Sequence, residues 1–547
     1  MAETMTPEMI AAAERIFGVT YTDGERALML DTLEEQLGVT ATRRVLRFDN
    51  AEPPALRFDP RLPQTRMPAP GPSRFRAADP GPLPADPADI AFAPLWQLSA
   101  WIAARKITSA ALTGIYLDRI ETLNPQLFCF ATVTADLARA EAAAADAALA
   151  AGRWLGPLHG IPYALKDLFD TAGVPTGWGA EPYRDRVPDR DAAVVARLRA
   201  AGAVLLGKTA VGALAYGDIW YGGTCRNPWN LEEGSSGSSA GSASATAAGL
   251  CGFAIGTETL GSITSPSQRC GTTGLRPTFG RISRQGGMAL CPSLDKVGPI
   301  CRAVEDTAMV LSVLNGPDPQ DRGSIDAPFP FDADAGIAGL RIGFLPEAFG
   351  SEATAVDHAA LDAVRRLGLS VTEVSLPDLP WNALLATVYA EAAAMFEDLT
   401  LEDRDDMLTA QTAGAWPNLF RAARFLSAVD HVQLDRLRFR AMQALHDMFE
   451  KIDVLIGPFS TGPMLVASNF TGHPCLHLRA GFLHSGTRTR TTIGRRQMVE
   501  QPGPKHRVPQ GISLWGRLFD EGTILRLGMA LEAELAVAAE RPAMAAG

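Results

Sequence analysis

Hydrophobic residues recur at near-helical spacing in the first fifty residues of the chain. Two segments, PEMIAAAERIF and DGERALMLDTLEEQL, show this pattern, and the second carries Leu28, Leu30, Leu33 and Leu37. We therefore predict an N-terminal helical extension over residues 1–50. Residues 51–94 are rich in proline and show little periodicity, which predicts an extended strap or linker lying on the main body.

From residue 95 onward, helical and strand patterns alternate, which predicts one large domain over residues 95–547. The run LWQLSAWIAARKITSAALTGIYLDRIETLNP predicts two helices, and an alanine-rich helix is expected from Ala135 to Ala151. A strand-like run, GIPYALKD, carries Lys166 in its middle, and DAAVVARLRAAGAVLLGKT predicts a helix followed by a strand. This alternation is typical of an α/β fold.

The second half of the chain carries further patterns of both kinds. Strands are expected at 340–345, 370–376 and 453–458, and the chain closes on a strand and a helix. Residues 381–448 are mostly helical in pattern and predict a cap over the active site, named here the cap region. The polar, Arg- and Thr-rich residues 484–507 predict a long loop.

Composition and charge exclude several classes of partner. The formal net charge of −11 gives no basic surface for nucleic acid or for an anionic membrane. No uninterrupted apolar run approaches the roughly 20 residues that span a bilayer, and the N-terminus lacks the pattern of a signal peptide. The seven scattered cysteines and eight dispersed histidines predict a cytoplasmic protein without disulfides, a metal site or a cofactor.

A glycine- and serine-rich stretch from Gly234 to Pro277 is the main chemical signal. It reads GSSGSSAGSASATAAGLCGFAIGTETLGSITSPSQRCGTTGLRP, and Phe253, Ile255 and Ile263 lie within it. A flexible linker does not carry such apolar residues. We therefore interpret it as a buried segment whose glycines let backbone approach backbone or a ligand.

Nucleophilic hydrolysis needs a nucleophile, a base and donors for the oxyanion. A Ser/His/Asp triad is disfavoured, because no GxSxG sequence follows a clear strand and precedes a helix, and no histidine lies in a motif typical of a base. A lysine acting through a serine is another solution. The chain offers Lys166 in an apolar strand, the pair Ser238 and Ser239, and Ser262 in GTETLGS.

These residues lie in motifs that resemble the amidase signature family of Ser-Ser-Lys amide hydrolases. The matching stretches are GIPYALKDLFDTAGVPTGWG, GTCRNPWN, GSSAGSASATAAGL, GTETLGSITSPSQRCGTTGLRPTFGRISR, SLDKVGPICRAVEDTA and NFTGHP. The resemblance covers about residue 95 to the C-terminus, and the first 90 residues lie outside it. It implies an α/β fold with a large central mixed β-sheet covered by helices on both faces.

The resemblance also implies roles for individual residues. Ser262 matches the nucleophile, Lys166 the base and Ser238 the bridging serine, which the family holds by a cis peptide. Of the two serine pairs in SSGSS, Ser238 is preferred over Ser235 because it places GSSAGSA on the family's GSSGGSA. The backbone N–H groups of residues in the nearby turn are expected to form the oxyanion hole: Thr259, Leu260, Gly261 and Ser262.

Three departures from the family pattern lie beside the nucleophile. The usual GTDTGGSIR reads GTETLGSIT here, so that Glu258 replaces an aspartate, Leu260 a glycine and Thr264 an arginine. A leucine is strained if the turn needs a positive φ at that position. The lost positive charge argues against a carboxylate-bearing substrate.

We predict an amidase that hydrolyses a carboxamide through an acyl-enzyme and acts on a small-molecule amide, with esters or carbamates as related substrates. Three aromatic residues, Trp178, Trp220 and Tyr221, are candidates for an apolar substrate pocket, although packing in the core is an equal alternative. Two other functions remain open: the glutaminase subunit of a tRNA-dependent amidotransferase, and a catalytically silent binding protein. A homodimer contact is one expectation for the N-terminal segment, and a strap on the body is the other.

Overall fold

The computed structural model describes residues 5–76, 79–490 and 498–545, and its centre is one large mixed β-sheet. Within these residues the sheet has 11 strands, in the spatial order β1 (Phe130–Val133), β3 (Val204–Thr209), β2 (Pro162–Lys166), β8 (Phe253–Glu258), β10 (Lys296–Cys301), β9 (Thr273–Arg276), β14 (Cys475–Ser485), β17 (His506–Gly516), β13 (Val454–Pro458), β11 (Arg341–Phe344) and β12 (Ser370–Glu373). Strands β3, β2 and β8 run parallel, as do β13, β11 and β12. The remaining ladders are antiparallel.

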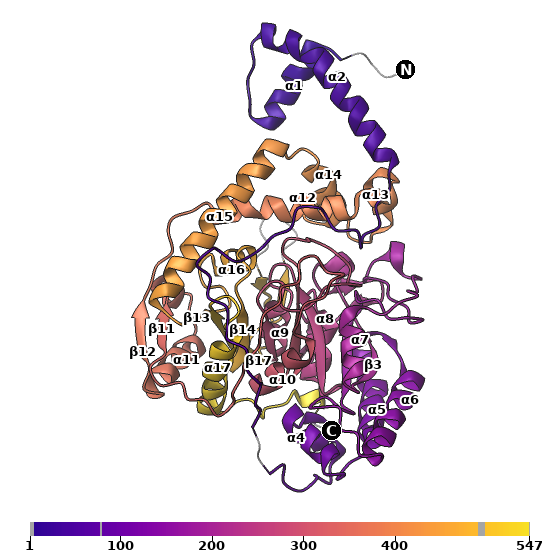
Figure 1. The fold of residues 1–547 in the computed structure, drawn as a ribbon, viewed down its shortest axis with the longest axis vertical. Coiled ribbons are helices and arrows are strands. Elements are labelled where there is room, and N and C mark those ends of the chain that lie inside the picture. Colours follow the sequence, from indigo (N-terminus) through magenta and orange to yellow (C-terminus); the bar gives the residue numbers. More distant parts are fainter. Residues whose placement is uncertain (1–4, 77–78, 491–497, 546–547) are drawn as a thin grey trace.

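Helices flank this sheet and carry much of the hydrophobic core (Figure 1). In the first half of the chain they are α3 (Pro87–Phe92), α4 (Leu95–Ala103), α5 (Ser109–Leu127), α6 (Ala135–Ala150), α7 (Ala193–Ala200), α8 (Ala240–Ala247), α9 (Thr264–Cys270) and α10 (Val304–Leu314). In the second half they are α11 (Ala355–Arg366), α12 (Leu385–Met395), α13 (Glu397–Leu401), α14 (Trp416–Ala423), α15 (Ala428–Lys451), α16 (Met464–Phe470) and α17 (Glu521–Leu535). The α/β prediction is confirmed.

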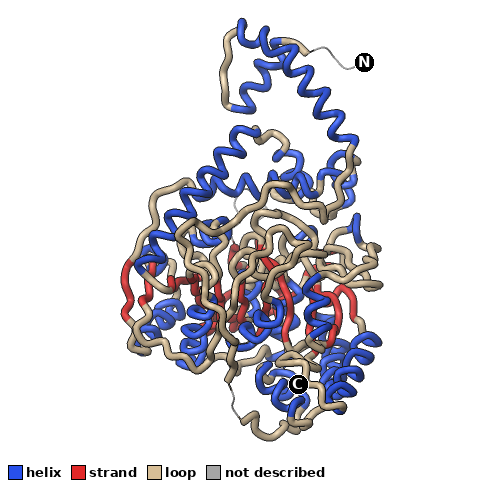
Figure 2. The backbone as a smooth tube through the Cα atoms, in the orientation of Figure 1, coloured by secondary structure: helices blue, strands red, loops and turns tan. Residues whose placement is uncertain are grey.

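Two helices precede this body, α1 (Pro7–Phe17) and α2 (Asp23–Val45). Their ends follow from local chemistry: Thr22 and Glu25 form a capping box at the start of α2, and Gly18 ends α1 with φ 66°. The pair projects from one end of the molecule (Figures 1 and 2). We name it the N-terminal arm.

The described part of the proline-rich residues 51–86 runs along the body without regular structure except for short turns (Figure 2). Its polar groups bond to segments more than 200 positions away. Arg57 donates to the carbonyl of Arg322, Ser73 donates to the carbonyl of Phe329, and the backbone at Arg74 forms a bridge with Asp332. We name this segment the strap.

The cap region contains helices α12 to α15, which lie between the sheet and the N-terminal arm (Figure 1). Arg438 on α15 ties this region to the body by donating to the carbonyls of Phe470 and Ser293, at 2.6 and 2.8 Å. None of the helices in the described residues is long and apolar enough to cross a membrane.

Three details differ from the sequence predictions. The last part of the predicted strap over residues 51–94 is not extended, because Pro87–Phe92 form helix α3. Lys166 is the last residue of β2 and not its middle, because the chain turns at once into the loop that follows. Residues 484–507 are not one long loop: β14 and β17 extend into them, and a small hairpin pairs β15 (Arg488–Arg490) with β16 (Met498–Glu500). The part of the predicted loop at 491–497 lies outside the described residues.

Two further ribbons, β4 (Ile219–Trp220) with β5 (Gly223–Thr224) and β6 (Arg226–Asn227) with β7 (Asn230–Gly234), precede the serine-rich segment. They lead the chain from β3 to the start of α8. Lys166, at the end of β2, thereby meets residues that come more than seventy positions later.

Candidate active site

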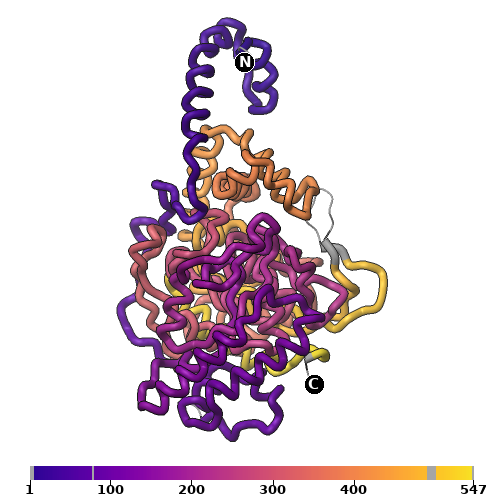
Figure 3. The backbone as a smooth tube through the Cα atoms, turned by 90° about the vertical axis from the view of Figure 1, so that its right-hand side faces the viewer, coloured from indigo at the N-terminus to yellow at the C-terminus, as the bar shows by residue number. Residues whose placement is uncertain are grey.

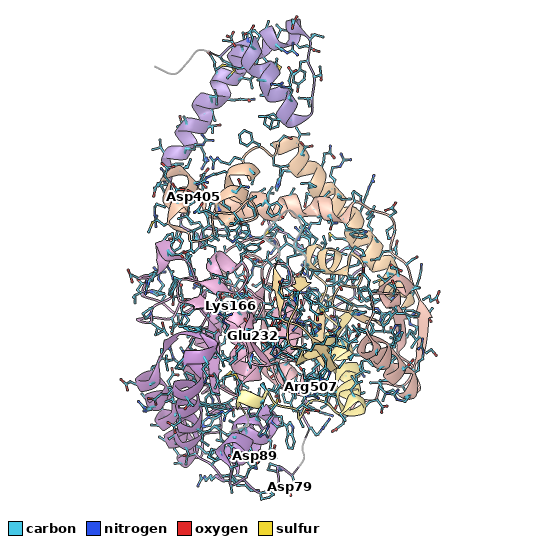
Figure 4. The ribbon with its side chains drawn as sticks, turned by 180° about the vertical axis from the view of Figure 1, so that it is seen from behind. Asp79, Asp89, Lys166, Glu232, Asp405 and Arg507 are labelled. Atoms are coloured by element: carbon cyan, nitrogen blue, oxygen red, sulfur yellow. The ribbon has the colours of Figure 1, made fainter. Side chains whose placement is uncertain are left out.

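Lys166 lies at the end of a strand that is covered on all sides. Strand β2 is flanked by the parallel strands β3 and β8, and each of its residues is buried. The Lys166 side chain is fully enclosed, near the middle of the molecule (Figure 4). Its Nζ lies 2.8 Å from Ser238 Oγ and 2.8 Å from Thr257 Oγ1, and 3.4 Å from the Thr257 carbonyl.

This environment favours the neutral amine. Burial lowers the pKa of Lys166 well below its ordinary value, and the negative charges of Asp295 and Glu258 oppose the change only in part. No carboxylate among the described residues forms an ion pair with Lys166. A neutral lysine can accept a proton from a hydroxyl, as a base requires.

Ser238 is held by the residues around it at the start of α8. The peptide bond between Gly237 and Ser238 is cis. A Cβ at Gly237 would lie 1.8 Å from the Gly217 carbonyl oxygen, so that only glycine fits there. The other candidate, Ser235, donates to the carbonyl of Ser236 and makes no contact with Lys166. The structure therefore brings Ser238, and not Ser235, to Lys166.

Ser239 joins this segment to the turn that carries Ser262. Its backbone N–H donates to the Ser262 carbonyl at 3.1 Å. Its hydroxyl donates to the carbonyl of Thr257 at 3.1 Å and accepts from the N–H of Thr257 at 3.2 Å. The two serine-bearing segments are therefore fixed against each other by backbone as well as side-chain bonds.

Ser262 lies in the turn between β8 and α9 and is 8% exposed, whereas Lys166 and Ser238 are at 0 and 1%. Within the described residues its hydroxyl has no hydrogen-bond partner, and the N–H groups of Thr259, Leu260, Gly261 and Ser262 donate to no protein acceptor. A run of amides without acceptors can bind a developing negative charge.

Two buried carboxylates hold this turn. Glu258 accepts from the N–H groups of Ile263 and Thr264 at 2.8 and 2.9 Å, and Arg276 donates to it at 2.6 Å. Burial disfavours the ionised carboxyl, but Arg276 and these backbone donors outweigh burial and lower the pKa of Glu258 to about 2. On the other side of the turn, Asp295 accepts from the Thr259 hydroxyl at 2.5 Å.

Leu260 and Thr264, two of the three departures from the family pattern, lie in different surroundings. Leu260 does not have a positive φ. The positive φ of this turn, 87°, belongs to Gly261, so Leu260 is not strained. The Leu260 side chain is partly buried and packs against an apolar cluster that includes Trp381 and Leu384 of the cap region. The Thr264 hydroxyl and amide both bond to Glu258 and not outward to a substrate.

The three aromatic candidates pack among other side chains and, in the part of the chain described, form no hydrogen bond with Ser238 or Ser262. Trp178 is buried and packs against Tyr183 and Phe396, with the Arg186 guanidinium 4.5 Å from its ring centre. Trp220 meets Tyr221 edge to face at 4.9 Å. A role for these residues in substrate binding stays a prediction.

The sequence did not single out Thr257, whose hydroxyl is as close to Lys166 Nζ as that of Ser238. The signal in the sequence was only its position five residues before Ser262; the pairing of β8 with β2, which brings Thr257 to Lys166, is seen in the structure alone. In the described parts of the chain, no group of three or more His, Cys, Asp or Glu residues is arranged to hold a metal ion.

Most of the chain is similar to proteins of one known family. The Amidase family model matches residues 111–525. Among curated relatives, a glutamyl-tRNA(Gln) amidotransferase subunit from Roseiflexus sp. (strain RS-1) is 38% identical over 459 residues, which cover 78% of this chain and 93% of that protein.

Solved structures give a similar result. The peptide amidase from Stenotrophomonas maltophilia is 29% identical, with a TM-score of 0.70 over 83% of this chain and 99% of its own. A bacterial aryl acylamidase of the amidase signature family, at 22% identity and a TM-score of 0.70 over 83% of this chain and 100% of its own, shows the same fold.

Proposed function

Because this chain belongs to the Amidase family, whose members hydrolyse amide C–N bonds, we propose that it cleaves a carboxamide through an acyl-enzyme formed on Ser262. The observation that carries the proposal is the fully buried Lys166 amine, 2.8 Å from the Ser238 hydroxyl and without a carboxylate partner among the described residues. A buried amine in such surroundings is a base and not a surface charge.

In the proposed mechanism, neutral Lys166 takes the proton of Ser238 while Ser238 takes the proton of Ser262. The Ser262 oxygen forms a bond to the substrate carbonyl carbon, and the carbonyl electron pair moves onto its oxygen. The four free amides from Thr259 to Ser262 stabilise that oxyanion, and a single such donor is typically worth about 2.7 to 4 kcal/mol.

Collapse of the tetrahedral intermediate returns the proton to the leaving nitrogen through Ser238, and the C–N bond breaks. Ammonia or an amine leaves, and the acyl group stays on Ser262 as an ester. Water then attacks this ester with the same base, which releases the acid and restores the serine.

We also propose that the protein acts as a stand-alone amidase on a substrate with an uncharged acyl group. Leu260, beside the amide donors, packs against the apolar cluster that includes Trp381 and Leu384, which supports a substrate with an uncharged acyl group. Thr264, in place of an arginine, adds no positive charge that could pair with a substrate carboxylate.

A second candidate is the glutaminase subunit of a tRNA-dependent amidotransferase. The names of several curated relatives favour it, and this chain covers 93% of the Roseiflexus protein. The N-terminal residues outside the family match and the substitution at Thr264 argue against it. Glutaminase activity that appears only when partner subunits are added would establish this second function and exclude the first.

The catalytic proposal is tested with a panel of primary amides, anilides, esters and carbamates on the wild type, Ser262→Ala and the matched control Ser235→Ala. We expect Ser262→Ala to lose activity on every substrate by about 10⁴-fold or more. Ser235→Ala should keep most of its activity, because its hydroxyl donates to the neighbouring Ser236 carbonyl and not to Lys166. Unchanged turnover in Ser262→Ala would show that Ser262 is not the nucleophile.

A further inference from the structure

One residue outside the family match is bonded to a loop beside the candidate active site. Asn50 lies in the turn that joins the N-terminal arm to the strap, where the N–H of Glu52 donates to the carbonyl of Asp49 at 2.9 Å. Figure 3 shows the lower end of the arm reaching the body beside the cap region. The turn presents the Asn50 side chain to two backbone segments 239 and 345 positions further along the chain.

The Asn50 side-chain amide makes a two-way contact with the backbone of Ala289. Its Nδ2 donates to the Ala289 carbonyl at 2.9 Å, and its Oδ1 accepts from the Ala289 N–H at 2.8 Å. The same Nδ2, which carries two hydrogens, also donates to the carbonyl of Met395, the last residue of α12, at 3.3 Å. Ala289 belongs to the loop that leads into β10, residues 288–295, named here the 288–295 loop. Asn50 therefore joins this loop to the cap region.

The carbonyl that Asn50 holds and the N–H that Asp295 holds belong to one peptide group. The Ala289 carbonyl accepts from Asn50, and the next N–H, that of Leu290, donates to Asp295 Oδ2 at 2.8 Å. A peptide group is planar, and in the trans form, which this one has, its C=O and N–H point in opposite directions. The Ala289–Leu290 peptide group is thus a rigid link, with Asn50 on one side and Asp295 on the other.

Asp295 connects this link to the turn from Thr259 to Ser262, named here the oxyanion turn. One oxygen of Asp295 accepts from the N–H groups of Leu290 and Cys291, at 2.8 and 2.9 Å. The other oxygen accepts from the Thr259 hydroxyl at 2.5 Å. Thr259 begins the run of amides that we propose to bind the oxyanion. A shift of the 288–295 loop therefore moves the first of these amides.

Other contacts hold the two ends of the 288–295 loop without Asn50. At its start, the N–H of Met288 donates at 2.9 Å to the carbonyl of Leu168, two residues after the proposed base. Nearer its end, the N–H of Ser293 donates at 2.9 Å to Glu391 on α12. Because these contacts remain when the Asn50 side chain is removed, we expect the loop to shift and not to unfold.

We propose that Asn50 is a positioning residue for catalysis, which acts on the oxyanion turn through the Ala289–Leu290 peptide group and Asp295. It contacts neither the reacting serine nor the base, but it fixes the support on which the first oxyanion donor rests. The inference rests on the proposed function, because it requires an oxyanion formed at Ser262. It gives the segment before the family match a part in the reaction.

The first test is the kinetics of Asn50→Ala in the full chain, on the best amide of the substrate panel. We expect kcat to fall by about 10- to 100-fold with little change in KM, because a small displacement of catalytic groups weakens binding of the transition state and not of the substrate. The Ki of a boronic acid, whose tetrahedral adduct on Ser262 occupies the oxyanion donors, should rise by a similar factor. Unchanged kcat and Ki, or a change in KM alone, overturns the proposal.

A merely structural role would change other quantities: the melting temperature, and the fraction of molecules that a fluorophosphonate probe labels at completion. Both should stay near the wild-type values in Asn50→Ala, and a loss of activity that only follows the unlabelled fraction overturns the proposal. Asn418→Ala is the matched control, since it removes a single bond of 2.8 Å from an asparagine amide to the Ala413 carbonyl within the cap region. Its kcat should equal that of the wild type.

A double-mutant cycle tests the route through Asp295. Thr259→Val removes the hydroxyl that bonds to Asp295 and keeps the backbone N–H. If Asn50 acts through this bond, adding Asn50→Ala to Thr259→Val should lower kcat by less than about twofold more, because the two sites are coupled. Losses that multiply in full overturn the proposal. Failure of the proposed function is seen separately, since Ser262→Ala would then keep its turnover, whatever Asn50→Ala does.

Discussion

Two lysines on adjacent strands of the sheet are buried to the same degree but differ in their neighbours. Lys166 ends β2 and Lys208 lies in the adjacent parallel strand β3, and both side chains are fully enclosed. Lys208 Nζ donates to the Phe169 carbonyl and to Thr176 Oγ1, both at 2.6 Å, and lies 3.6 Å from Asp167. Lys166 Nζ instead lies near two hydroxyls, of Ser238 and Thr257, and near the Thr257 carbonyl.

The difference shows what turns a buried lysine into a base. Burial disfavours the ammonium form in both cases, but Asp167 offsets it at Lys208, whose pKa is lowered only to about 8. Burial lowers the pKa of Lys166 well below its ordinary value, and Asp295 and Glu258, which form no ion pair with it, oppose this change only in part. Lys208 is thereby suited to hold the structure together, and Lys166 to take a proton.

The largest expected effect comes from Lys166→Met. The substitution keeps a similar volume and removes the base, so we expect the acylation rate to fall by about 10³- to 10⁴-fold, the upper range for general base catalysis. The melting temperature should change little, since no buried charge loses a partner. Acylation is measured by burst kinetics or by labelling of Ser262 with a fluorophosphonate probe. Full activity in this variant would mean that another group is the base.

The matching substitution Lys208→Met should affect stability and not chemistry. It leaves the Asp167 carboxylate buried without its cation, which typically costs about 3 to 5 kcal/mol. Urea unfolding measures this loss, and the rate per folded molecule should stay near that of the wild type. Adding Asp167→Asn should recover part of the stability. A Lys208→Met variant that is stable but inactive would contradict the prediction, because Lys208 would then act in catalysis and not in stability.

Gly261→Ala tests the turn that carries Ser262 and the proposed oxyanion donors, which would act together with Lys166. The residue has φ 87°, which strains an alanine, and a Cβ there would lie 3.3 Å from the Leu465 side chain, so the substitution disturbs the turn and its amides. We expect kcat to fall by about 10²- to 10³-fold, as for loss of one oxyanion donor. Gly173→Ala is the control, because it has a similar φ of 73° with open space around it. Equal activity in both variants would remove Gly261 from the oxyanion turn.

The pH dependence of kcat/KM gives the smallest expected effect near neutral pH. The protonated form of Lys166 cannot accept a proton, so kcat/KM should be constant at high pH and fall about tenfold per pH unit below the lowered pKa of Lys166. The acidic limb should persist in Lys208→Met, because Lys208 takes no part in proton transfer. A rate that rises toward acid pH would contradict the mechanism.

Much of this arrangement could be predicted from the chain itself. Periodicity predicted the helices of the arm and the main strands, because one buried face imposes a regular pattern. The small hairpin within residues 484–507 was missed, since its polar, two-residue alternation is weak. The strain expected at Leu260 is absent, because only the backbone trace shows that the positive φ falls on Gly261.

The contacts of Lys166 depended on tertiary structure. Motif resemblance pointed to Ser238, but the approach of Thr257 follows from the pairing of β2 with β8, which no local pattern specifies. The same holds for Lys208, which reads as an ordinary lysine in LLGKT until Asp167 is placed beside it.

The strap has a consequence for how the chain matures during translation. Residues 51–86 leave the ribosome early, yet the groups they bond to, including Arg322, Phe329 and Asp332, come more than 200 positions later. At about 5 to 20 residues per second, that interval lasts on the order of ten seconds or more. The strap must therefore wait unattached until these residues have been made, and the N-terminal arm waits longer, because its anchors Glu397 and Asp398 come later still.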